Sequence, residues 1–175
     1  MRRDDTATIG DLAEDHAIRL LQDRGWNVTD LNVETRNHRL YDLRAEKDGR
    51  QVMISVKHAR AKREIRLGSL RVFRDLQDDD FIIIFLPRQK GAETDIERGD
   101  YELWLVPGSA RHQAIHAHLQ YYAMDEARAS GHPIMIKDKV DRPGGKSSSG
   151  KAFHTWQTAY RDAWHLLDQT SELGR

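Results

Sequence analysis

Leu40-Tyr-Asp-Leu-Arg-Ala-Glu-Lys-Asp-Gly-Arg-Gln-Val-Met-Ile-Ser-Val-Lys-His58 is the part of the sequence that most constrains the fold. Apolar and polar residues alternate over 40–45 and again over 51–58, which indicates two strands. The polar segment 46–50, which contains a glycine, is typical of a hairpin connection. The sequence therefore predicts an antiparallel pair at the centre of the fold.

The register of this hairpin brings polar residues together. If Glu46 pairs with Gln51, then Asp42 lies opposite Ser55 and Lys57 lies diagonally from Asp42. An acid and an ammonium group thus meet on a sheet built otherwise from aliphatic residues. They form either an ordinary cross-strand salt bridge, worth about 0.2–1 kcal/mol if exposed, or part of a functional site.

Helical and strand patterns alternate along the rest of the chain. Apolar residues at helical spacing predict a helix over 9–24, ended by Gly25. We expect further strands at 26–33, 81–86, 101–106 and 134–136, and further helices at 69–76, 107–123 and 153–167. We expect loops at 59–68 and 88–100 and a flexible loop at about 137–151. This order predicts an α/β fold, a mixed central sheet flanked by helices with C-terminal helices added. It favours a single domain over 1–175 with its core at about 9–123.

Composition narrows the class of protein. The chain has 175 residues, 28 basic and 28 acidic side chains, and a formal net charge of zero. It contains no cysteine, which excludes disulfides, thiolate zinc sites and a cysteine nucleophile. The longest strongly apolar run, 81–86, is far shorter than the ~20 residues of a membrane-spanning helix. No secretory signal is visible, so we expect a cytoplasmic protein without a membrane partner.

Glu14 is placed unusually on the first predicted helix. On a helical wheel it lies between Ile18 and Leu21 in the apolar arc, whereas Asp11 and Asp15 lie on the opposite side. An inward carboxylate is costly unless it meets a cation. Glu14 and Asp42 therefore suit an oxygen-ligated divalent metal such as Mg²⁺, although Arg39, Arg44 or Lys57 could instead neutralise Glu14 in a purely structural network.

Four short motifs, taken together, resemble the PD-(D/E)XK nuclease superfamily, which includes restriction endonucleases and archaeal-type Holliday-junction resolvases. They are Gly10-Asp-Leu-Ala-Glu14, Gly25-Trp-Asn-Val28, Tyr41-Asp-Leu43 and Ile54-Ser-Val-Lys57. The segment 101–107, with Trp156 and Trp164, is similar to small bacterial members of undefined role. The resemblance covers about 9–106 well and implies a restriction-endonuclease-like αβββαβ core.

The resemblance implies a nuclease that uses Mg²⁺ or Mn²⁺ to hydrolyse phosphodiester bonds in DNA. It also implies a homodimer, since many enzymes of this superfamily cut both strands as dimers. It assigns Asp42, Glu14 and the Val56 carbonyl to the metal, and Lys57 to the attacking water or the transition-state charge. Ser55 belongs to the same site but departs from the pattern, because it stands where the superfamily has Glu or Gln. Glu34 or His58 could compensate for it.

That departure leaves two other functions open. One is a catalytically degenerate module that binds nucleic acid without cutting it, and the other is a subunit of a restriction or repair complex.

A basic segment follows the third strand and predicts the nucleic-acid contact. Between 57 and 74 the chain has seven basic residues and one acid. Such a run is either a solvated face or a phosphate-binding surface, and its place directly after Lys57 favours the second. The expected contacts are Arg60, Lys62, Arg63, Arg66 and Arg71, joined by Lys146 and Lys151 from the flexible loop.

Three other patterns favour ordinary structure. The segment 145–152 mimics a phosphate-binding loop but ends in Ala152 where a hydroxyl is needed. His112 and His116 have zinc-binding spacing, yet an exposed helix face explains them better. The stripe Trp156, Tyr160, Trp164 and Leu167 is typical of packing against a sheet.

Overall fold

The computed structural model describes residues 8–34, 40–58, 64–87, 95–122, 133–137 and 158–169. Their elements, in chain order, are α1 (Thr8–Gln22), β1 (Asn27–Asp30), α2 (Leu31–Glu34), β2 (Leu43–Lys47), β3 (Arg50–His58), β4 (Glu64–Ser69), α3 (Leu70–Arg74), β5 (Phe81–Pro87), α4 (Asp95–Arg98), β6 (Tyr101–Pro107), a 3₁₀ turn η1 (Gly108–Ala110), α5 (Arg111–Tyr122), β7 (Pro133–Lys137) and α8 (Trp164–Asp168).

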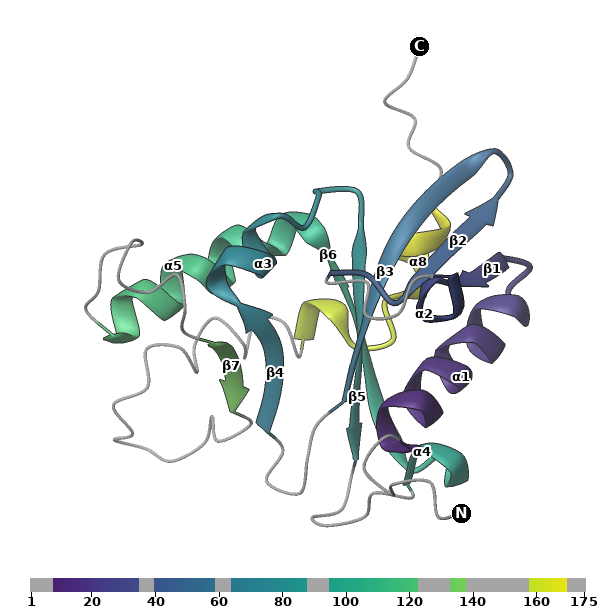
Figure 1. The fold of residues 1–175 in the computed structure, drawn as a ribbon, viewed down its shortest axis with the longest axis horizontal. Helices are drawn as coiled ribbons and strands as arrows, with labels where there is room; N and C mark the ends of the chain where they lie inside the picture. The colour runs from purple at the N-terminus through teal and green to yellow at the C-terminus, as the bar shows by residue number, and fades with distance from the viewer. Residues whose placement is uncertain are drawn as a thin grey trace.

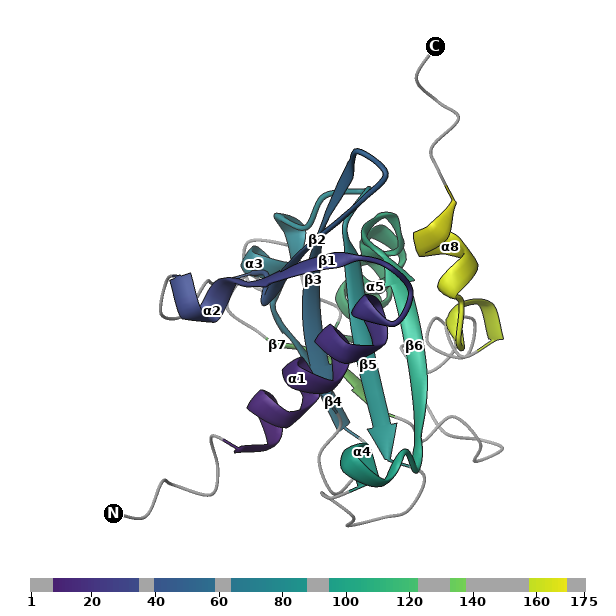
Figure 2. The same ribbon diagram turned by 90° about the vertical axis from the view of Figure 1, so that its right-hand side faces the viewer.

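A five-stranded mixed sheet, in the order β1-β2-β3-β5-β6, forms the centre of the fold. β3 and β5 run parallel, and every other neighbouring pair in this sheet is antiparallel. In Figure 1, α1 lies on one side of the sheet and α3 and α5 lie on the other, and Figure 2 shows α1 crossing in front of the strands. The predicted α/β class, with a mixed sheet flanked by helices, is confirmed.

The central hairpin folds as the sequence predicts. β2 and β3 pair with Glu46 opposite Gln51. Asp48 and Gly49 connect them with φ angles of 52° and 78°, the left-handed conformation that a tight two-residue hairpin turn requires. The register that places Asp42 opposite Ser55 is therefore present in the folded chain.

Strand β5 is buried on both faces and divides the core into two clusters. Ile82, Ile84 and Leu86 pack with α3 and α5, whereas Phe81, Ile83 and Phe85 pack with α1. On α1 the packed side chains are Ala13, Ala17 and Leu21, spaced as one helical face. The alternation of strand β5 thus explains why both faces of the sheet carry helices.

Several predicted elements differ from the structure, among them the loop expected at 88–100, which contains the short helix α4. The strand expected at 26–33 ends at Asp30, and the helix α2 follows directly. The Asp30 carboxylate accepts a hydrogen bond from the Asn32 N–H (2.8 Å), which turns the chain out of the strand and into the helix. The loop expected at 59–68 contains β4, which pairs with β7 in a separate two-stranded sheet. β4 has a β-bulge between Arg66 and Gly68, where the glycine φ is +118°.

The closing helix expected over 153–167 is not continuous. Residues 158–160 are helical, but Arg161 bridges Trp104, the Asp162 N–H donates to Leu103 O (2.9 Å), and α8 begins only at Trp164. These backbone contacts cover the exposed edge of β6, which is the physical reason for the break. The aromatic stripe is divided accordingly: Tyr160 packs in the α3–α5 cluster and Trp164 in the α1 cluster.

A buried carboxylate joins the hairpin to the turn before β5. Asp80, only 6% exposed, accepts hydrogen bonds from the Tyr41 hydroxyl, the Met53 N–H (3.2 Å) and the Gln77 N–H (3.2 Å). Burial and the bond to Asp80 raise the pKa of Tyr41, which remains a donor at neutral pH. This network fixes the segment that leads into Asp42.

Replacing Asp80 by Asn is expected to reduce the free energy of unfolding by about 2 kcal/mol, because the amide offers one acceptor oxygen to three donors. Urea denaturation followed by circular dichroism measures the change. Asp79→Asn is the matched control: Asp79 is exposed, so its substitution should stay within about 0.5 kcal/mol of the wild type. Equal loss in both variants would contradict the role given to the network.

Within the described ranges, no helix has the length and apolar character needed to cross a membrane.

Candidate functional site

The site is centred on the Asp42 carboxylate, just before β2. The Asp42 N–H donates to Ile54 O (2.9 Å) and its carbonyl accepts from the Leu31 N–H (3.0 Å), so neighbours on both sides hold the backbone. One carboxylate oxygen, Oδ2, accepts the Val56 N–H at 2.6 Å. Asp42 is therefore anchored at the point where β2 and β3 begin to separate.

Two side chains from β3 complete this cluster. The Ser55 hydroxyl donates to Asp42 Oδ2 at 3.3 Å, and Lys57 Nζ lies 3.5 Å from the same oxygen. The Asp42 side chain is 16% exposed and the Lys57 side chain 25%, so a ligand can reach both. The structure thus brings Asp42, Ser55 and Lys57 together, as the hairpin register predicts.

Ser55 and the Val56 carbonyl both make hydrogen bonds within the cluster. Ser55 is 4% exposed and its hydroxyl faces Asp42, so it acts on the orientation of that carboxylate. The Val56 carbonyl accepts a hydrogen bond from Lys57 Nζ at 3.1 Å. A carbonyl oxygen has a second lone pair, so this bond leaves one acceptor position on Val56.

Glu14 approaches this cluster from α1 and is half-buried. Its Oε2 accepts a hydrogen bond from the Asn32 amide at 2.9 Å. Burial raises the pKa of Glu14 from 4.5 to about 6. The bond from Asn32 lowers that pKa, and the negative charges of Asp42 and Asp30 raise it further. The two carboxylates are thus close enough to repel each other, an arrangement that a divalent cation would relieve.

Glu14→Gln, in metal-free protein, is expected to be more stable than the wild type at about pH 7.5, by about 1 kcal/mol. Because the folded pKa of Glu14 exceeds its unfolded value, its stabilising contribution is complete below the unfolded pKa and is lost as the pH rises through about 6. The shift corresponds to about 2 kcal/mol, which solvent screening of a half-exposed group reduces to about 1 kcal/mol.

Urea denaturation with chelator present, at about pH 4 and about pH 7.5, measures this difference. Glu46→Gln, an exposed carboxylate on β2, serves as control and should follow the wild type at both pH values. An identical pH dependence of the free energy of unfolding in Glu14→Gln and the wild type would show that ionised Glu14 does not destabilise the fold.

Asn32 was not predicted from the sequence as a site residue. It lies on α2, and its position depends on the bond between its N–H and the Asp30 carboxylate. The Asp-Leu-Asn spacing at 30–32 is a local signal for such a turn. That signal predicts the turn but not the contact with Glu14, which is 18 residues away in the chain.

The predicted nucleic-acid contacts are mostly outside the described residues. Those outside are Arg60, Lys62, Arg63, Lys146 and Lys151, together with the side chain of Arg66. The side chain of Glu34, a possible substitute for Ser55 rather than a nucleic-acid contact, also lies outside them. Arg71 is exposed on α3, and the possible substitute ligand His58 is half-buried at the end of β3. Arg71 thus stays available as a predicted contact.

The donor set suits a hard cation such as Mg²⁺. Among the residues that the structure describes, no group of three or more His, Asp or Glu side chains is arranged to hold a metal. Mg²⁺, however, commonly binds through one or two carboxylates and completes its shell with waters and substrate phosphates. Glu14 and Asp42 are the two carboxylates that such a cation could use, and the Val56 carbonyl, which accepts from Lys57 Nζ, keeps one lone pair.

The chain was compared with known proteins and structures. No protein-family model and no curated protein matches it. Among solved structures, it is similar to the bacterial homing endonuclease I-Ssp6803I, with a TM-score of 0.47 and 20% identity over 93% of this chain and 90% of that one. Similarity at this level establishes neither family membership nor a shared activity.

Proposed function

We propose that this protein is a metal-dependent nuclease that hydrolyses phosphodiester bonds in DNA. The observation that carries the proposal is the convergence of Lys57 and Asp42, 3.5 Å apart, with a half-buried Glu14 whose pKa is raised partly by the Asp42 charge. The resemblance of the four motifs to PD-(D/E)XK nucleases supports the same function.

The residues of this chain have separate roles in the proposed reaction. Asp42 and Glu14 would hold Mg²⁺ or Mn²⁺, with the Val56 carbonyl as a further oxygen. When bound, such a cation activates water and offsets charge on the phosphoryl oxygens. Ser55 and the Val56 N–H orient the Asp42 carboxylate through its Oδ2.

Lys57 acts chiefly as a fixed positive charge. Its ammonium group contacts Asp42 Oδ2 (3.5 Å) and Val56 O (3.1 Å). These two contacts hold the positive charge beside the Asp42 carboxylate. An ammonium group has no lone pair to accept a proton and is a poor base. Its contribution is therefore to orient the attacking water and to stabilise the negative transition state.

Cleavage of supercoiled plasmid, single-stranded DNA and a four-way junction tests the proposal. The wild-type protein should cut at least one of them with Mg²⁺ or Mn²⁺, and chelator should stop the reaction. Salt-sensitive binding of all three without cleavage would instead favour the nucleic-acid-binding module, an alternative supported by Ser55 at the position where the pattern has Glu or Gln.

A further inference from the structure

Three consecutive residues, Asp30-Leu31-Asn32, contact both residues that would hold the cation. The Leu31 N–H donates to Asp42 O (3.0 Å), and the Asn32 side-chain amide donates to Glu14 Oε2 (2.9 Å). Glu14 comes from α1, whereas Asp42 lies in the segment just before β2. One short turn therefore joins two elements that each carry one carboxylate of the site. We call it the Asp30–Asn32 turn.

The Asp30–Asn32 turn is itself held in place. The Asn32 N–H donates to Asp30 Oδ1 (2.8 Å), which closes the turn locally. Leu31 is 6% exposed and packs in the α3–α5 cluster, so the turn is anchored in the core. The backbone of Asn32 cannot shift without moving a buried side chain. The amide that reaches Glu14 is therefore carried on a fixed backbone.

The hydrogen bond from Asn32 engages one oxygen of Glu14 and leaves the other. In the part of the chain that the structure describes, no further hydrogen bond or ion pair reaches the Glu14 carboxylate, so the lone pairs of Oε1 remain for a ligand. The three contacts to the Asp42 side chain likewise all fall on one oxygen, Oδ2. The protein thus holds each carboxylate through a single oxygen.

A neutral amide suits this position because it orients Glu14 without cancelling its charge. A lysine or arginine there would pair with the carboxylate and compete with a metal ion. Asp30 and Asp42 lie near enough for their negative charges to act on Glu14 as well. The negative charge at the site is therefore left for a cation to offset, while the carboxylate keeps one orientation.

Given the nuclease function proposed above, we propose that Asn32 is a positioning residue for the metal, holding Glu14 through Oε2 so that Glu14 binds the cation through Oε1. Asn32 touches neither substrate nor reacting atoms, and it acts only through Glu14. Removing a hydrogen-bond partner of a metal ligand typically lowers metal affinity or activity about 10–100-fold. We expect Asn32 to lie at the lower end of that range, because its bond is half-buried.

A Mn²⁺ titration of the full chain without DNA, followed by electron paramagnetic resonance, tests this role. Asn32→Ala is expected to weaken Mn²⁺ binding about 10-fold, although it keeps the Asn32 N–H that closes the turn. Asn32→Gln keeps an amide donor and should bind Mn²⁺ within about 3-fold of the wild type. Asn27→Ala is the matched control, since Asn27 is an exposed asparagine on β1, and it should bind like the wild type.

Urea denaturation of the metal-free variants separates positioning from a purely structural role. A structural role would lower the stability of Asn32→Ala and leave the Mn²⁺ affinity of the folded protein unchanged. In cleavage assays, positioning predicts that Asn32→Ala needs about 10-fold more Mn²⁺ for half-maximal rate and loses less at saturating Mn²⁺. Wild-type Mn²⁺ affinity in folded Asn32→Ala, or the same loss in Asn27→Ala, would overturn the proposal.

Mn²⁺ binding and DNA cleavage distinguish this proposal from the nuclease itself. Weaker Mn²⁺ binding by Asn32→Ala, in a protein whose wild type cuts no DNA, would support the role of Asn32 and overturn only the nuclease. Cleavage with the same Mn²⁺ dependence in Asn32→Ala and the wild type would overturn only the role of Asn32. A wild-type protein that binds no Mn²⁺ would overturn both.

Discussion

Asp42→Asn is expected to reduce Mg²⁺-dependent DNA cleavage by about 100-fold or more, which corresponds to about 2.7 kcal/mol of transition-state stabilisation. The substitution removes the carboxylate that Lys57, Ser55 and the Val56 N–H contact. It also removes one of the two acids available to a cation. Initial cleavage rates at fixed enzyme and metal concentrations measure the effect.

Glu46→Gln is the matched control for this prediction, because it removes an exposed carboxylate four residues along the same hairpin. It should cut at the wild-type rate. Since Asp42 also bonds the β3 backbone, urea denaturation must show that the Asn variant is folded.

Lys57→Met provides a second variant that keeps the side-chain length without the charge, and it should also lose most activity. If both folded variants cut as fast as the wild type, the site assignment is wrong.

The hairpin and its cluster were predictable because they depend on local chemistry. A strand has a side-chain period of two, and a two-residue turn with Gly49 sets the register. Once Glu46 opposes Gln51, the positions of Asp42, Ser55 and Lys57 follow from counting. The approach of Glu14 was predictable for a similar reason, since helical spacing identifies which face of α1 turns inward.

The features that were not predicted depend on contacts between distant parts of the chain. β4 becomes a strand only by pairing with β7, more than sixty residues later. The break before α8 depends on backbone bonds to the edge of β6. The Asn32–Glu14 bond requires α2, which follows β1, to lie near α1 in the folded chain. Local propensity carries no information on any of these pairings.

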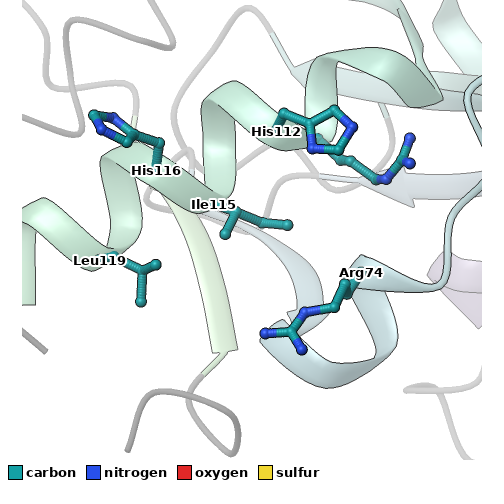
Figure 3. A pocket seen from close by; sticks show the side chains of 6 residues that line it. Arg74, His112, Ile115, His116 and Leu119 are labelled. Carbon is teal, nitrogen blue, oxygen red and sulfur yellow. The ribbon is translucent and has the colours of Figure 1, made fainter. Parts of the chain in front are cut away.

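The pocket between α3 and α5, which Arg74, His112 and His116 help to line, shows the same limit (Figure 3). Counting along the sequence places His112 and His116 on one face of a helix, and an ordinary exposed face explains this spacing better than a zinc site. Only the fold places Arg74, from a helix nearly forty residues earlier, across from them. The function of such a histidine pair depends on which side chains face it, and tertiary structure decides which ones do.

Gly108→Ala is expected to reduce the free energy of unfolding by more than about 4 kcal/mol or to prevent folding. A Cβ at this position would lie 1.7 Å from Gln77 O and 2.9 Å from the Gln77 carbonyl carbon. Both are backbone atoms, so no side-chain rotation can relieve the overlap. Urea denaturation, or the fraction of soluble folded protein, measures the result.

The effect should reach beyond η1 because Gly108 is bonded to the turn that supports the hairpin. Its N–H donates to Asp80 O at 2.6 Å, and the Asp80 side chain accepts from Tyr41 and Met53. Gly10→Ala is the matched control: a Cβ there meets nothing within 4 Å, and alanine favours the helix by about 0.5–1 kcal/mol. Unfolding of Gly108→Ala at the wild-type midpoint would mean that the contact between η1 and the Gln77–Asp80 turn is not part of the native packing.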